Sequence, residues 1–210
     1  NVTFDGEEYI VDGNQKAVIG DYYIEPDVSA ACYFYAMAAV TGGKITVRNV
    51  FESSVQGDMK FLNVLAEMGC EVTETKDGIT VSRTGGLKGI DVNMNNFSDQ
   101  ALTLAAIAPF ADGDTVIRNV GHIRGQECDR MAAIINELTK CGVACHISGD
   151  DIFISSGSAH GAEIETYDDH RVAMAFTVTG LVTGGMVIDN PMCCRKTFEN
   201  YYEVLEKLIE

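Results

Sequence analysis

The chain has 210 residues, 46% of them hydrophobic, so it is long enough to bury a substantial core. Its formal net charge of −16 would repel the phosphates of a nucleic acid or of an anionic membrane surface, so neither is an expected partner. No apolar stretch approaches the roughly 20 residues of a membrane span, and residues 1–10 have neither the basic start nor the apolar core of a signal peptide.

The cysteine and histidine patterns disfavour a disulfide framework and a metal site. Seven cysteines are an odd number and include no C-x-x-C pair, which is typical of reduced thiols in a cytoplasmic protein. The four histidines show no i, i+4 pairing of the zinc-protease type, so the sequence predicts no bound metal.

A strand pair is predicted within residues 1–19, and a unit of mixed strands and helices follows it. The unit comprises a short strand, an apolar alanine-rich helix, a strand, an amphipathic helix and a strand pair around a tight turn. In chain order these elements are predicted at residues 22–26, 29–40, 42–50, 57–69 and 70–83.

The same order of elements recurs about 70 residues later, which indicates a repeated supersecondary unit. In this second copy the elements are predicted at residues 89–96, 99–110, 112–120, 128–142 and 143–156. A third copy has no closing strand pair, and its elements are predicted at residues 162–167, 170–181, 184–192 and 199–210. The missing pair leads us to expect a piece of a longer protein.

The complete unit reads strand, helix, strand, helix, strand, strand (βαβαββ), so the predicted fold class is α/β. Its first helix is apolar on all sides, and such a helix must be covered all round. We therefore expect three buried helices inside a ring of sheets. The units are assigned to about residues 21–85, 86–157 and 158–210 of one truncated domain, and residues 1–20 to a strand pair outside it.

Polar residues precede the apolar helices and are expected to cap them. Asp27 and Ser29 suit this role at the first helix, and Asp168 and Asp169 suit it at the third. Arg171 does not, because a cation in the first turn opposes the helix dipole unless an anion is near. We expect its partner to be either one of the two preceding acids or an anionic ligand.

Two further groups of charged residues stand at helix starts. Arg124, Glu127 and Arg130 open the amphipathic helix of the second unit, where a solvated face with i, i+3 ion pairs is the simplest interpretation. Arg195 and Lys196 precede the last helix and are most simply two surface cations. If helix starts from different units gather at one rim, however, these cations would form an anion pocket.

Five motifs follow one another along the chain: IEPDVSAACYF, NMNNFSDQALTLAA, HIRGQECDRM, TYDDHRVAMAF and CCRKTF. Together they resemble the C-terminal half of the 5-enolpyruvylshikimate 3-phosphate synthase family. Its enzymes have two lobes, each of three βαβαββ units, with the active site between the helix starts of both. The resemblance implies one inside-out α/β barrel lobe at residues 21–210, a strand pair of the other lobe at 1–20, and a missing N-terminal half of the same enzyme as a partner.

The resemblance also implies a reaction. The family transfers the enolpyruvyl group of phosphoenolpyruvate to the 5-hydroxyl of shikimate 3-phosphate and releases phosphate, with no metal or other cofactor. Arg130 and Arg171 match the arginines that hold the phosphoenolpyruvate carboxylate, and Lys196 matches a lysine at its phosphate. A planar guanidinium suits a carboxylate, and an ammonium suits phosphate. The reaction belongs to aromatic amino acid biosynthesis, and glyphosate inhibits it.

Two acids match groups that transfer protons in the family. Glu127 matches the acid at the methylene carbon, and Asp99 matches the carboxylate at the shikimate hydroxyls. The resemblance places His170 close to the phosphate. His122 and Gln126 stand where the family often has Asn and Lys at the shikimate substrate, so this chain has one cation fewer there.

Three other assignments stay open from the sequence. UDP-N-acetylglucosamine enolpyruvyl transferases share the fold but lack the D-H-R and K-T-F pair of motifs. RNA 3′-phosphate cyclases have similar units, but a nucleic-acid substrate conflicts with the charge of −16. The third is a non-catalytic half-domain used for structure or binding. We expect no turnover from one lobe alone, because the site needs charges from both, and we expect the intact enzyme to be a cytoplasmic monomer.

Overall fold

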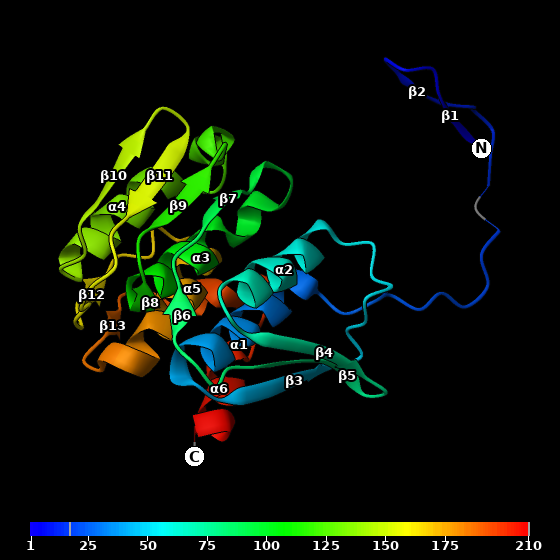
Figure 1. Ribbon diagram of the computed structural model, residues 1–210. Helices are drawn as coiled ribbons and strands as arrows, with labels where there is room; N and C mark the ends of the chain where they lie inside the picture. The colour runs from blue at the N-terminus through cyan, green and yellow to red at the C-terminus, as the bar shows by residue number, and fades with distance from the viewer. Residues whose placement is uncertain (17, 210) are drawn as a thin grey trace.

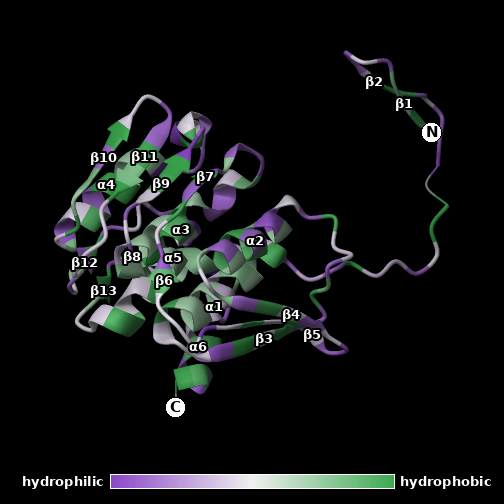
Figure 2. Ribbon diagram, in the orientation of Figure 1, coloured by the Kyte–Doolittle hydropathy of each residue, from purple (hydrophilic) through white to green (hydrophobic). Residues whose placement is uncertain are grey.

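Three buried helices lie at the centre of the computed structural model, which describes residues 1–16 and 18–209. They are α1 (Val28–Thr41), α3 (Ala101–Ile107) and α5 (His170–Thr183), and they pack against one another. Most of their side chains are buried, as expected for helices without a polar face, and Figure 2 shows how hydrophobic residues predominate along them. The predicted central helices are confirmed, although α3 is shorter than predicted because 3₁₀ turns flank it.

The first unit forms a three-stranded antiparallel sheet in the order β3, β5, β4. Its strands and the helix beside them are β3 (Lys44–Arg48), β4 (Glu71–Thr75), β5 (Gly78–Ser82) and α2 (Lys60–Glu67). The strand predicted at 22–26 is wrong. No strand pairs with this segment in the described chain, and the Gln56 side chain instead binds Pro26 O at 2.7 Å and Val28 N at 2.8 Å.

The second unit forms a four-stranded sheet in the order β10, β11, β9, β7, in which β7 is parallel to β9 and the other neighbours are antiparallel. Its elements are β7 (Asp91–Asn93), β9 (Thr115–Arg118), α4 (Arg130–Lys140), β10 (Cys145–Ser148) and β11 (Asp151–Ile154). The predicted hairpin is confirmed. One pair was not predicted, a short parallel one between β6 (Leu87–Lys88) and β8 (Ala111–Asp112).

The described residues of the third unit form two short parallel strands, β12 (Glu163–Ile164) and β13 (Val187–Ile188), followed by α6 (Tyr201–Ile209). Both strands are shorter than predicted. Gly184 and Gly185 have positive φ, so the backbone does not become extended until after them. The sheets of all three units lie outside the central helices, in agreement with the predicted fold class, and the described strands do not close into a barrel (Figure 1).

An N-terminal arm stands away from this body (Figure 1). It carries the antiparallel hairpin of β1 (Val2–Phe4) and β2 (Tyr9–Val11), as predicted within residues 1–19. The strands are exposed on both faces, and Tyr9 is 75% exposed. The described residues include no helix long and apolar enough to cross a membrane.

The helix starts confirm some predicted caps and correct others. Asp27 accepts from Ala30 N at 3.2 Å at α1, and Asp169 accepts from Arg171 N at 2.9 Å at α5. The other two predicted caps are wrong. The Ser29 hydroxyl binds the buried Asp58 carboxylate, and the Asp168 carboxylate accepts from Asn190 Nδ2 at 3.1 Å.

Candidate functional site

The starts of α4 and α5 and the 3₁₀ turn Asn95–Gln100 before α3 meet around one hollow of about 400 Å³. Six of the eight residues predicted from the sequence line it: Asp99, Gln126, Glu127, Arg130, His170 and Arg171. The elements that supply them come from the second and third units. The structure therefore brings helix starts of different units to one rim, as the anion-pocket hypothesis requires.

Arg130 is the first residue of α4 and is almost completely buried. Its Nε donates to Asp169 Oδ2 at 2.7 Å, and its Nη1 donates to Asp99 Oδ1 at 3.1 Å and to Gln126 Oε1. A cation at a helix start opposes the dipole, and two carboxylates offset that cost. The interpretation of this segment as a solvated face is wrong for Arg130, whereas Arg124 does form an exposed pair with Asp150.

Arg171 is the second residue of α5, and its Nη2 donates to Asp99 Oδ2 at 2.8 Å. Its side-chain partner is thus Asp99 and neither of the two preceding acids, Asp168 and Asp169. Burial opposes the charge, but Tyr33 and Asp99 nearby raise the pKa of Arg171 above its usual value. One carboxylate, that of Asp99, therefore holds two guanidinium groups at the mouth of the hollow.

Asp169 has a larger role than the helix cap predicted for it. It is fully buried and binds Arg130 through both carboxylate oxygens. Burial by itself would raise the pKa of the Asp169 carboxyl, but the hydrogen bonds and charge of Arg130 hold it below its usual value. No local pattern signals this pair, because 39 residues separate its members.

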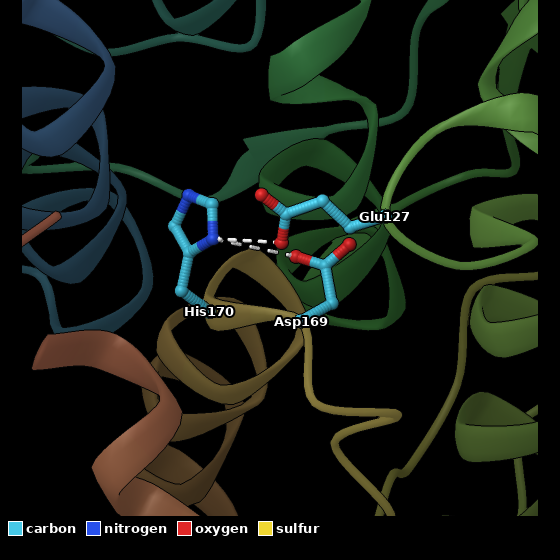
Figure 3. A group of neighbouring side chains, drawn as sticks. All are labelled: Glu127, Asp169 and His170. Atoms are coloured by element: carbon cyan, nitrogen blue, oxygen red, sulfur yellow. Dashed lines mark hydrogen bonds and ion pairs between the residues drawn. The ribbon is translucent and has the colours of Figure 1, made fainter. Parts of the chain in front are cut away.

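His170 and Glu127, which also line the hollow, face each other (Figure 3). His170 Nδ1 lies 3.1 Å from Glu127 Oε2 and 3.7 Å from Asp169 Oδ1. Burial lowers the pKa of His170, and Glu127 acts in the opposite direction. Lys196 does not line the hollow, but its Nζ binds the same Glu127 oxygen, so its ammonium lies at the edge.

Glu127, Asp169 and His170 also have the ligand types and spacing of a metal site, since one ligand atom from each lies within 4.8 Å of the others. Two of these three residues, however, already pair with cationic side chains of the protein. Asp169 accepts from the guanidinium of Arg130, and Glu127 accepts from the ammonium of Lys196. A divalent cation would have to displace or face both charges, so this donor set fits an ion-pair network.

The two residues expected at the shikimate substrate occupy different places. Gln126 lines the hollow and lies 3.4 Å from Asp99 Oδ1 through its Nε2. His122 does not line it; its Nε2 lies 2.8 Å from the Ser98 hydroxyl, next to Asp99 in the chain. Of the eight predicted residues, His122 is the one that the structure connects least directly to the rest.

The arrangement can hold a small anion. Two guanidinium groups and one ammonium border the hollow, and the N-terminal ends of α4 and α5 add their partial positive charge. Glu127 and Asp99 add carboxylates within the same space, where a proton can be taken up or released. A planar carboxylate or a phosphate is the ligand chemistry that these donors suit best.

The fold is an α/β arrangement of repeated units around buried helices, and the site gathers cations and carboxylates at the helix starts. The family model described as EPSP synthase (3-phosphoshikimate 1-carboxyvinyltransferase) matches residues 1–205. The chain belongs to this family. The description of this family names neither of the two alternative enzymes considered from the sequence, the UDP-N-acetylglucosamine enolpyruvyl transferases and the RNA 3′-phosphate cyclases.

Relatives of this chain carry the same name. The 3-phosphoshikimate 1-carboxyvinyltransferase of Nostoc punctiforme is 45% identical over 203 residues, which are 97% of this chain and 48% of that protein. The chloroplastic enzyme of Solanum lycopersicum is 46% identical over an alignment of 211 positions, which covers 96% of this chain and 40% of that protein. A solved EPSP synthase from Acinetobacter baumannii matches with a TM-score of 0.84 and 26% identity over 99% of this chain and 51% of its own. The chain spans about half the length of the curated relatives it matches.

Proposed function

We propose that this chain forms one lobe of a 3-phosphoshikimate 1-carboxyvinyltransferase. The intact enzyme transfers the enolpyruvyl group of phosphoenolpyruvate to the 5-hydroxyl of shikimate 3-phosphate and releases phosphate. The observation that carries the proposal is the pair of guanidinium groups, Arg130 and Arg171, that share the Asp99 carboxylate beside Glu127 and His170.

Phosphoenolpyruvate has the two anionic groups that this site suits. In the proposal Arg130 and Arg171 bind its carboxylate with the Nη groups that now donate to Asp99, because guanidinium N–H groups suit carboxylate oxygens. Lys196 and His170 bind its phosphate from the edge, where the ammonium lies beside Glu127. The anionic groups of the ligand then take over part of the charge pairing that Asp99 and Glu127 now provide for these cations.

Proton transfer falls to the two carboxylates. Asp99 takes the proton of the attacking 5-hydroxyl, and Glu127 moves a proton to and from the methylene carbon of the enolpyruvyl group. Contacts support this division: Asp99 lies on the side of Gln126, and Glu127 lies beside Lys196, the group proposed at the phosphate. Gln126 and His122 complete the shikimate side of the site.

The rest of the site belongs to a second lobe in this proposal, and residues 1–20 belong to that lobe as well. Three observations support the division: the exposed β1–β2 hairpin stands away from the body, the described body holds three units around α1, α3 and α5, and the relatives are about twice as long. One lobe alone is expected to give no turnover, because catalysis depends on charges that converge from both sides.

The test combines this chain with the N-terminal half of the Nostoc punctiforme relative and measures phosphate release from the two substrates. We expect release from the mixture and none from either half alone. Arg171→Lys should lower the rate strongly, whereas Arg124→Lys, at an exposed pair outside the hollow, should not. Equal rates for these two variants would contradict the proposed site, and a mixture that assembles without releasing phosphate would contradict the proposed reaction.

A cytoplasmic setting and a monomeric state remain part of the proposal. Seven free cysteines support a reducing compartment. The tomato relative is named as chloroplastic, so the compartment varies within the family.

A further inference from the structure

The segment that leads into α5 is joined to α4 at successive points. Glu165 N donates to Glu137 Oε2 at 3.1 Å, and the Tyr167 hydroxyl donates to Glu137 Oε1 at 2.7 Å. Asp169 then binds Arg130, which is the first residue of α4. The segment therefore runs along α4 from Glu137 toward the site, and β12 at its beginning lies against the same helix (Figure 1).

A tight turn interrupts this segment just before the site residues. Asp169 N donates to Thr166 O at 2.8 Å, and the two central residues of the turn, Tyr167 and Asp168, have φ of 54° and 56°. Positive φ at both central positions is the pattern of a type I′ turn, which is dominated by Gly, Asn and Asp. A tyrosine at the first of these positions is strained, so something outside the turn must hold it.

Glu137 is the external contact of that tyrosine. Its carboxylate is fully buried and accepts from Lys140 Nζ at 2.9 Å as well as from Tyr167 and Glu165 N. A buried carboxylate is tolerated only when its oxygens are satisfied in this way. Burial and Glu137 raise the pKa of Tyr167 to about 12, so its hydroxyl keeps the proton that it donates. Asn136 Nδ2 adds a second contact, at 3.2 Å from the same hydroxyl.

We propose that Tyr167 is a positioning residue: its hydroxyl, held by Glu137, keeps the strained turn closed and so sets Asp169 and His170 against Arg130 and Glu127. The turn ends at Asp169. A shift of this residue moves its carboxylate, which both binds Arg130 and caps α5. The expected effect on phosphoenolpyruvate binding rests on the proposed function, whereas the expected effect on closure of the turn does not.

The alternative is that Tyr167 only packs its ring against the core, with which it is in contact. Two substitutions separate these roles. Tyr167→Phe keeps the ring and the strain but removes the hydroxyl, whereas Tyr167→Gly removes the ring and the hydroxyl but also removes the strain, because glycine adopts positive φ freely. A positioning role predicts an open turn in the first variant and a closed turn in the second. A packing role predicts the reverse order.

Hydrogen exchange of the Asp169 amide measures the turn, since this amide makes the closing hydrogen bond. The rate is compared with that of the Phe176 amide in the middle of α5, which corrects for global stability. We expect relative exchange to rise at least about tenfold in Tyr167→Phe and to stay closer to wild type in Tyr167→Gly. Tyr202→Phe is the matched control, because its hydroxyl contacts Thr177 on α5 at 3.2 Å and takes no part in the hydrogen bond that closes the turn.

Equal relative exchange at Asp169 in Tyr167→Phe and Tyr202→Phe would overturn the proposal, and so would faster exchange in Tyr167→Gly than in Tyr167→Phe. The same proteins are then titrated with phosphoenolpyruvate. We expect Tyr167→Phe to bind at least several-fold more weakly than Tyr202→Phe. If the wild-type chain and its mixture with a complementary half both fail to bind phosphoenolpyruvate, the proposed function fails, while the exchange rates still decide whether Tyr167 positions the turn.

Discussion

The guanidinium of Arg130 and the carboxylate of Asp169 form a buried pair between the starts of α4 and α5, with Nε and Oδ2 2.7 Å apart. Asp169 is fully buried, and Arg130 is 3% exposed. Asp169 also caps α5 through the Arg171 amide. One carboxylate therefore fixes both helix starts that carry the proposed phosphoenolpyruvate arginines.

Removing the charge of Asp169 should destabilise the fold. Asp169→Asn leaves the Arg130 guanidinium buried without its closest counter-charge, and breaking a buried pair in this way costs about 3 kcal/mol of unfolding free energy. Urea unfolding measures the loss. Asp150→Asn, at the exposed pair with Arg124, should lose less than about 1 kcal/mol. Similar losses in both variants would mean that the buried pair is not a structural centre of the site.

Neutralising Asp99 should separate binding from turnover. Asp99 now holds Arg130 and Arg171 together, and its charge repels a ligand carboxylate in the same hollow. We expect Asp99→Asn to bind phosphoenolpyruvate several-fold more tightly, as calorimetry would show, because that repulsion is lost. Phosphate release by the complemented enzyme should nevertheless disappear with the proposed base. Weaker binding by the variant would show that Asp99 helps to hold the ligand.

His170 should make stability depend on pH near neutrality. Burial places its pKa in the folded state below the unfolded value of about 6.5, so the unfolded chain takes up the proton first as the pH falls. Stability is then lost from about pH 6.5 downward through the folded pKa. His170→Gln should flatten the unfolding free energy in this window, measured by denaturant titration at several pH values. A wild-type curve that stays level there would contradict the assignment.

The lowered pKa of Asp169 acts in a different window, which keeps the two effects apart. Its stabilisation is present above the unfolded value of about 3.9 and is lost only as the pH falls through the lower folded value. The slope between about pH 6.5 and pH 5 is therefore the one to compare between wild type and His170→Gln.

The N-terminal arm should be dispensable for the stability of the body. Its hairpin is exposed on both faces and stands apart from the central helices. Deletion of residues 1–24 should change the unfolding free energy of the body by less than about 0.5 kcal/mol. Deletion of residues 1–28 should cost more, because it removes the Asp27 cap of α1 and the backbone groups that Gln56 binds. Equal losses would mean that the arm contacts the body in solution.

Composition and periodicity predict the centre of the fold well. Helices α1 and α5 have no polar face, and a helix of this kind has no place except inside the protein. The hairpins β4–β5 and β10–β11 follow from alternation around a tight turn. The strand predicted at 22–26 fails because a β-branched and aromatic run forms a strand only if a partner edge is available, and here Gln56 binds the end of that run instead.

The sequence predicts a set of residues that the structure brings together, but it does not predict the network that they form. The motifs bring six of the eight residues into one hollow, because helix starts of repeated units meet at a common rim. The pairing of Asp169 with Arg130 and the contact of Tyr167 with Glu137 join segments about 30 to 40 residues apart, and no local pattern encodes such tertiary pairs. The positive φ of Tyr167 contradicts its residue preference, so only the structure reveals that turn.

The proposed site requires that Arg130 and Arg171 bind the same small anion, and NMR of the arginine Nε–H groups tests this during a titration with phosphoenolpyruvate. We predict saturable shifts of the Arg130 and Arg171 signals. Arg83, whose guanidinium binds carbonyls near the C-terminal end of α1 and does not line the hollow, should show no comparable shift. Unchanged signals from both site arginines up to roughly 20 mM ligand, or equal shifts at all three, would contradict it.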